Sequence, residues 1–196
     1  MDEVERVNQP AGRREASWLS WLWPGAMHRA VFRALGPMAG TETILDIGCG
    51  IGGLLHAVRR HWPGVHATGV DPAEKALEVA REKTPDGLFL VGYAEALPLP
   101  TTSADIAVST FSFHLWHDQA TALREVARVL RPRGIFVLLE PCMPPWISNL
   151  MRWPRFATKQ ETESLLTAAG FRVESSRSQW LLCRTTVARK EERQPQ

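Results

Sequence analysis

The chain has 196 residues, of which 44% are hydrophobic and 22% are charged, and its formal net charge is +2. The composition is typical of a globular protein, and the length suits one domain but is too short for two ordinary ones. The low net charge, without clustered Lys and Arg, argues against a nucleic-acid partner. Three cysteines without a C-x-x-C pair suit a reducing compartment, and neither a signal peptide nor a membrane-spanning run is found. We therefore expect a cytoplasmic protein.

Apolar periodicity predicts strands that alternate with helices along the chain. Two short helices are expected within residues 15–38, and the second, about 26–35, has Met27, Val31 and Leu35 at a spacing of four. The expected strands are 43–47, 65–70, 88–91, 105–109, 135–140, 171–176 and 181–188. The further helices are expected at 53–62, from 73 onward, at 119–130, and between a cap at Thr158 and a stop at Gly170. This alternation predicts a doubly wound α/β sheet that binds its ligand at the carboxyl ends of the strands.

A glycine-rich turn follows the first strand and opens a helix. Such a turn lets the backbone approach a ligand, and the start of the helix offers unpaired N–H donors, which together favour an adenine-containing cofactor. Gly48, Gly50 and Gly53 also satisfy G-x-G-x-x-G, so the turn alone does not separate NAD from other cofactors. A dehydrogenase normally needs a second domain or a Tyr-Lys pair, and Tyr93 is the only tyrosine. NAD is therefore the weaker alternative.

Several motifs follow one another at consistent spacing between Thr43 and Pro141. They are Leu45–Gly52, Val70–Pro72, Ala94–Leu99, Asp105–Ser109 and Leu123–Pro132. In this order they resemble the class I S-adenosylmethionine-dependent methyltransferases, in particular the small-molecule branch (methyltransferase type 11) that includes the quinone methyltransferases. The resemblance implies a single Rossmann-like domain with a seven-stranded sheet of order 3-2-1-4-5-7-6, in which strand 7 is antiparallel. It also implies S-adenosylmethionine as the cofactor.

The resemblance divides the chain into four parts. A flexible N-terminus, 1–14, precedes a helical lid at 15–40, the donor-binding domain spans 41–189, and a charged tail covers 190–196. The expected function is methyl transfer to a small apolar or aromatic acceptor. Two alternatives are a lipid or quinone methyltransferase that works at a membrane interface, and a non-catalytic donor-binding regulator or partner subunit. The oligomeric state is left open.

The resemblance also implies which residues bind the donor. Asp46 is expected to orient the glycine turn and to help hold the methionine ammonium group. Gly48, Cys49 and Gly50 are expected to present their backbone to the donor, and Cys49 is given no thiol chemistry. Asp71 is expected to accept both ribose hydroxyls, a bidentate role suited to a carboxylate at a strand end.

The segments around the ribose and adenine leave alternatives open. Asp71 could instead be the N-cap of the next helix, with Pro72 at its first position, whereas Pro72 in the donor site would pack on adenine. Relatives usually have an acid where Tyr93 stands, so here the ring would meet the Ala94 N–H, with Tyr93 stacking or bonding through its hydroxyl. Glu95 either contacts the donor or is a surface residue.

Two histidines and a serine follow or end the fourth strand. Ser109 is expected beside the transferred methyl group, and because it replaces a metal-binding carboxylate, no metal is expected. His114 or His117 could be a general base, since a reference pKa near 6.5 suits proton removal from a phenol, an amine or an acidic carbon. The alternative is a packing or helix-start role. Methyl transfer often needs no base, because positioning supplies much of the rate.

Aromatic side chains indicate the nature of the acceptor. The chain has eight tryptophans, and several flank the core where this family builds its lid and pocket wall. The expected pocket residues are Trp18, Trp21, Trp23, Met27, Phe111 and Trp146. They favour an apolar, aromatic or cationic acceptor, and the alternatives are core packing and peripheral contact with a membrane interface without stable insertion.

Overall fold

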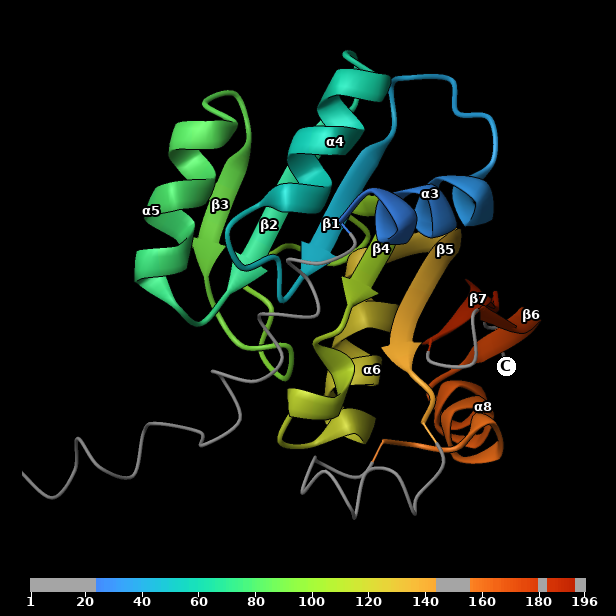
Figure 1. Ribbon diagram of the computed structural model, residues 1–196. Coiled ribbons are helices and arrows are strands. Elements are labelled where there is room, and N and C mark those ends of the chain that lie inside the picture. Colours follow the sequence, from blue (N-terminus) through green and yellow to red (C-terminus); the bar gives the residue numbers. More distant parts are fainter. Residues whose placement is uncertain (1–23, 144–155, 180–182, 193–196) are drawn as a thin grey trace, which may run out of the picture.

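The computed structural model describes residues 24–143, 156–179 and 183–192 (Figure 1). The helices are α3 Pro24–Leu35, α4 Gly53–His61, α5 Glu74–Lys83, the short 3-10 turn η1 Phe113–Leu115, α6 Gln119–Val129 and α8 Lys159–Ala168. The strands are β1 Thr43–Ile47, β2 His66–Asp71, β3 Leu88–Val91, β4 Ala104–Thr110, β5 Leu130–Pro141, β6 Phe171–Gln179 and β7 Cys183–Lys190. None of the described helices is long and apolar enough to cross a membrane.

The seven strands form one sheet with the order β3-β2-β1-β4-β5-β7-β6. The five strands from β1 to β5 pair in parallel, whereas β7 is antiparallel to both β5 and β6. The expected fold class, strand order and antiparallel strand 7 are therefore confirmed. The arrowheads of β1 to β5 all point to the lower side of Figure 1, which is the carboxyl edge of the sheet.

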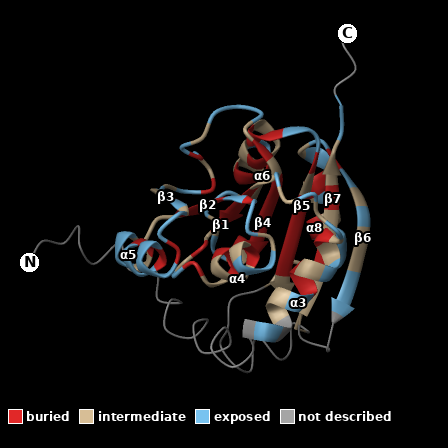
Figure 2. Ribbon diagram, turned by 90° about the horizontal axis from the view of Figure 1, so that it is seen from above, coloured by how far each residue is buried: buried red, intermediate tan, exposed pale blue. Residues whose placement is uncertain are grey.

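Helices cover both faces of this sheet (Figure 2). Side chains alternate along β1, so that Ile44 packs with α3, α4 and α5 on one face while Leu45 and Ile47 pack with α6 on the other. Asp46 lies between Leu45 and Ile47 and is 1% exposed, so the sheet carries a buried carboxylate next to its carboxyl edge. Burial on both faces explains the near-continuous apolar runs of the central strands.

The N-terminal helix α3 is built into this core. Val31 is fully buried and Leu35 is 9% exposed, and both pack in the cluster that also contains Val137 and Leu139 of β5. Met27 is half-buried against the same cluster. The second of the two helices expected before the core is thus present, and the first lies outside the described residues.

Several boundaries differ from the expected ones for physical reasons. Asp71 is not the N-cap of α5, because it remains the last residue of β2 and Ala73 occupies the cap position in an extended conformation. Strand β5 begins at Leu130 rather than Ile135, because Leu130 pairs with Ala104 ahead of an irregularity in the ladder.

The closing strands also end later than expected. Strand β6 extends to Gln179, and β7 begins at Cys183 and includes Lys190, the first residue of the expected tail. The Lys190 Nζ donates to the Leu130 carbonyl over 2.7 Å, which holds this end of β7 against β5. The capping box of α8 is present as expected, with Thr158 and Glu161 each accepting from the other's backbone N–H.

Candidate active site

Asp46 is the most unusual group at the carboxyl edge. Its Oδ1 is buried and has no hydrogen-bond partner within the part of the chain that the structure describes. Burial, with a smaller contribution from the nearby Asp71 carboxylate, raises the pKa of Asp46 from 3.8 to about 7. A buried carboxylate without a partner is costly, and a cation placed beside it would remove that cost.

Asp71, at the end of β2, joins the glycine turn to the start of α5. Its Oδ2 accepts the Gly50 N–H over 2.9 Å, and its Oδ1 accepts the Ala73 N–H over 2.8 Å. Both carboxylate oxygens therefore hold backbone near the carboxyl edge, and each keeps a further lone pair for a ligand hydroxyl. Pro72 lies between these contacts and is half-buried.

Two glycines of the turn have different surroundings. A side chain at Gly48 would collide with Ser112, since an added Cβ would lie 2.4 Å from the Ser112 side chain. At Gly50 an added Cβ would meet nothing within 4 Å, so open space adjoins this part of the turn. Gly48 is thus explained by close packing, whereas Gly50 leaves room for a ligand.

Ser109 lies inside the protein. It is fully buried, and its hydroxyl is 2.8 Å from that of Ser112, which in turn donates to the Ile47 carbonyl over 2.7 Å. This chain of hydroxyls joins the ends of β4 and β1 behind the glycine turn. Cys49 is 8% exposed, and burial together with the neighbouring carboxylates raises the pKa of its thiol, which keeps it protonated and unreactive.

Tyr93, Glu95 and His117 come together at the β3 side of the edge. The rings of Tyr93 and His117 meet edge to face with centroids 6.1 Å apart, and Tyr93 is 51% exposed. Glu95 Oε1 accepts the backbone N–H groups of His117 and Asp118 over 2.7 and 3.1 Å. Ala94 is buried beneath them. Glu95 is therefore engaged in a connection between segments rather than being a simple surface residue.

His114 is separated from His117 and pairs with a carboxylate of β5. Its Nδ1 lies 2.7 Å from Glu140 Oε2, and the two side chains are 5% and 12% exposed. The same carboxylate accepts the backbone N–H groups of Phe113 and His114 over 3.0 and 3.3 Å. The ring of Phe156 covers His114 edge to face with centroids 5.0 Å apart. With Nδ1 donating to Glu140, Nε2 is the nitrogen that can accept a proton.

A small polar recess adjoins this pair. Antiparallel pairing places Arg184 of β7 directly opposite Glu140 of β5. Both line the recess together with Phe113, Thr162 and Thr186. The Nε of Arg184 is buried and has no hydrogen-bond partner among the described residues. The recess is lined by a guanidinium and by the carboxylate that holds the His114 imidazole, and its volume of about 10 Å³ is enough for a water molecule only.

Neither Glu140 nor Arg184 was expected in the site. A carboxylate that ends an apolar strand at the carboxyl edge is a signal that could have indicated Glu140. Arg184 carries no such signal, because its place depends on how β7 pairs with β5. Among the expected pocket residues, Phe111 has φ +55°, a strained conformation for a bulky residue, and its N–H donates to the Leu139 carbonyl over 2.8 Å. Trp18, Trp21, Trp23 and Trp146 lie outside the described residues.

The residues present fit S-adenosylmethionine. The unpartnered Asp46 Oδ1 matches a cationic ammonium, the open space at Gly50 matches a ligand against the turn, and Asp71 retains acceptor capacity for ribose hydroxyls. No group of three or more His, Cys, Asp or Glu in the described segments is arranged to hold a metal ion.

Comparison with known proteins gives relatives by sequence. Residues 45–138 match a family model described as a methyltransferase domain. The chain is 38% identical over 104 residues to a demethylmenaquinone methyltransferase of Thermotoga maritima, covering 53% of this chain and 45% of that protein. It is 32% identical over 133 residues to a chloroplastic 2-methyl-6-phytyl-1,4-hydroquinone methyltransferase of Oryza sativa, covering 65% and 40%. The chain spans less than half of the length of these two relatives.

Solved structures agree on the fold. A methyltransferase from Aquifex aeolicus, described as SAM dependent, superposes with a TM-score of 0.74 at 21% identity, covering 89% of this chain and 98% of that one. At this level of identity the likeness shows the fold alone, a Rossmann-like α/β fold. Residues 45–138, just under half of the chain, match the methyltransferase domain model, and the sequence relatives carry methyltransferase names.

Proposed function

We propose that this chain transfers the methyl group of S-adenosylmethionine to a small aromatic acceptor with an ionisable hydroxyl, of the hydroquinone kind. The observation that carries the proposal is the pair of sites at one edge of the sheet. Asp46 and Asp71 are the candidate donor ligands, and His114 with Glu140 is the candidate proton acceptor. The quinone and hydroquinone substrates in the names of two relatives support the acceptor class.

On the donor side, this chain's residues bind and orient. Asp46 would hold the methionine ammonium by charge, the turn at Gly50 would lie against the donor, and Asp71 would accept ribose hydroxyls while keeping the turn in place. When bound, S-adenosylmethionine supplies an electrophilic methyl on a sulfonium sulfur, which leaves with the bonding electron pair. Positioning of the acceptor in line with that bond then supplies much of the rate.

On the acceptor side, His114 would take the hydroxyl proton of the acceptor at Nε2. Glu140 would hold the imidazole by its Nδ1–H and stabilise the imidazolium that results. Loss of the proton leaves negative charge on the acceptor oxygen and on the adjacent ring carbons, and one of these atoms forms the new bond to the methyl carbon. When a ring carbon forms this bond, its hydrogen then leaves as a proton and the hydroxyl is restored. Arg184 of the same recess would attract an oxygen that carries this charge.

A thermal melt tests the donor. At 100 times its Kd, S-adenosylhomocysteine should add about 2.7 kcal/mol of stability, whereas NAD at the same concentration should add nothing. A shift with NAD alone would exclude the methyltransferase function. Turnover of the bound donor with a reduced quinone, followed by mass spectrometry of the methylated product, separates a transferase from a donor-binding regulator.

The base is tested by substitution. His114→Gln should lower kcat by about a hundredfold or more and leave the affinity for S-adenosylhomocysteine unchanged. Glu140→Gln should lower kcat less, because an amide oxygen can still accept the Nδ1–H of the imidazole. His66→Gln is the matched control, since His66 lies at the start of β2, at the opposite edge of the sheet. An unchanged kcat in His114→Gln would remove the base from the mechanism.

A further inference from the structure

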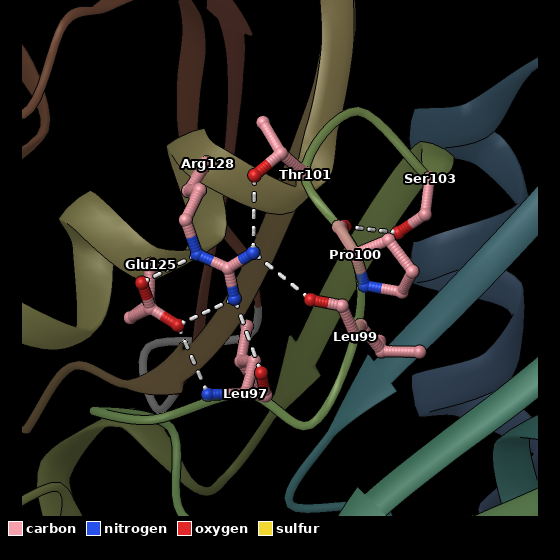
Figure 3. Close-up of polar contacts among 7 residues, drawn as sticks. All are labelled: Leu97, Leu99, Pro100, Thr101, Ser103, Glu125 and Arg128. Atoms are coloured by element: carbon pink, nitrogen blue, oxygen red, sulfur yellow. Dashed lines mark hydrogen bonds and ion pairs between the residues drawn. The ribbon is translucent and has the colours of Figure 1, made fainter.

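The connection between β3 and β4, residues 92–103, contains no helix. A segment of this length leaves many backbone N–H and C=O groups without helical partners, and such groups need partners elsewhere. Here several of them pair with side chains of α6, the helix that follows β4 (Figure 3). The same connection includes Tyr93, Ala94 and Glu95, which are expected at the adenine side of the donor site.

Two residues of α6 hold the later part of this connection. Arg128 donates from Nη1 to the Leu99 carbonyl over 2.9 Å and from Nη2 to the Leu97 carbonyl over 3.1 Å. Glu125 accepts the Leu97 N–H over 3.1 Å through Oε2. Glu125 and Arg128 also form an ion pair, with Nε 2.7 Å from Oε1 and side chains 21% and 33% exposed. Figure 3 shows the guanidinium lying between the carboxylate and the two carbonyls.

The early part of the connection is held at the other end of the same helix. Glu95 accepts the N–H groups of His117 and Asp118, and Asp118 is the N-cap of α6, accepting the Thr121 N–H over 3.0 Å. Helix α6 therefore fastens residues 95–99 at two points. Between these points Leu97 is 4% exposed and packs in the cluster that contains Leu123 of α6. The backbone at this place has little freedom to move.

We infer that Glu125 and Arg128 are positioning residues for the adenine side of the donor site. The inference rests on the proposed function and deepens it. Tyr93 replaces the acid that would accept from the adenine amino group, so adenine recognition depends more on backbone groups such as the Ala94 N–H. Arg128 and Glu125 hold the same connection at Leu97 and Leu99, three and five residues after Ala94, and so would limit the movement of the backbone that leads to it. These side chains act through the connection and do not contact the donor themselves.

Calorimetry with S-adenosylhomocysteine tests the inference. Arg128→Ala should weaken binding by about tenfold, the effect of losing hydrogen bonds from a charged donor. Glu125→Gln should weaken it less, because an amide oxygen can still accept the Leu97 N–H. The matched control is Arg131→Ala, which removes an ion pair with Asp105 of β4, outside the connection 92–103. The control should destabilise the protein and leave the donor affinity unchanged.

A second ligand separates positioning from general destabilisation. S-inosylhomocysteine carries an oxo group in place of the adenine amino group, so the ratio of the two affinities reports on the adenine side alone. We expect Arg128→Ala to lower the ratio of the affinity for S-adenosylhomocysteine to that for S-inosylhomocysteine. We also expect faster hydrogen exchange at the Leu97 amide in the ligand-free variant. The inference would be overturned if Arg128→Ala and Glu125→Gln each bound both ligands with the same affinities as the parent. Absence of binding to the parent would overturn the proposed function instead.

Discussion

The two edges of the sheet differ in how their charges are satisfied. At the amino edge, Asp105 accepts both the Thr43 N–H and the Arg131 guanidinium, and Lys190 donates to the Leu130 carbonyl. At the carboxyl edge, the Asp46 Oδ1 and the Arg184 Nε are buried without a partner in the described chain. The amino edge is completed by its own residues, whereas the carboxyl edge contains groups that a ligand would complete.

This contrast separates stability from binding. A fully paired charge contributes to folding, and its removal leaves a partner unsatisfied. An unpaired buried charge lowers the stability of the ligand-free protein and becomes favourable only when a complementary charge arrives. Substitutions at the two edges should therefore have opposite signatures, and the following predictions test that difference.

The largest effect is expected on stability at high pH. The raised pKa of Asp46 means that the folded state binds its proton more tightly than the unfolded state does. Stability therefore falls as the pH rises from about 4 to about 7, and the full cost, on the order of 4 kcal/mol, is present above that window. Asp46→Asn should remove it, so urea unfolding at pH 8 should show a more stable variant. At pH 4 the variant and the parent should differ little.

The same substitution should have the opposite effect on the ligand. Without the carboxylate, the donor ammonium loses its charge partner, and the affinity for S-adenosylhomocysteine should fall by about a hundredfold. In the parent protein, donor affinity should increase as the pH rises through about 7, because Asp46 must be ionised to bind a cation. Titration calorimetry at pH 6 and pH 8, on the parent and on the variant, measures the effect of the substitution and the pH dependence of the affinity. A variant that loses stability and keeps its affinity would reverse the assignment of this edge.

At the amino edge, Asp105→Ala should cost about 1–2 kcal/mol, because it leaves the Thr43 N–H and the Arg131 guanidinium without their acceptor. Unfolding in urea measures this cost. The donor affinity of the folded variant should equal that of the parent. A loss of affinity comparable to that of Asp46→Asn would show that the two edges are not independent.

The smallest effect is expected at Arg133. This residue has φ +61°, in the left-handed region that favours glycine. Arg133→Gly should stabilise the protein by about 1 kcal/mol through relief of that strain, since the exposed ion pair with Glu192 contributes little. Arg133→Ala, which removes the ion pair and keeps the strain, is the control and should give no gain. Thermal unfolding compares the two.

Much of the fold could be predicted, because strands buried on both faces and helices with one apolar face carry strong patterns. The glycine turn and the acidic residues at strand ends were likewise visible in the sequence. What could not be predicted depends on contacts between distant segments. Asp71 looked like a helix cap, but Gly50, from another element, takes one of its oxygens. Strand β5 looked shorter, because the pairing of Leu130 with Ala104 is not encoded locally.

The two histidines show the same limit. Both flank Trp116 and both were candidates for the base, with His114 preferred, and folding directs His114 toward Glu140 and His117 toward Tyr93. The distinction rests on partners contributed by β5 and by the segment after β3. No local pattern around either histidine contains that information.

The antiparallel course of β7 has a consequence for how such proteins diversify. It returns a late part of the chain, around Arg184, to the edge where Glu140 ends β5. The candidate donor ligands are encoded between Asp46 and Glu95, well before either residue. The matched family segment ends at Leu138, so Glu140 and Arg184 both lie beyond it. Proteins that share the donor-side segment can therefore differ at this pair of residues on β5 and β7.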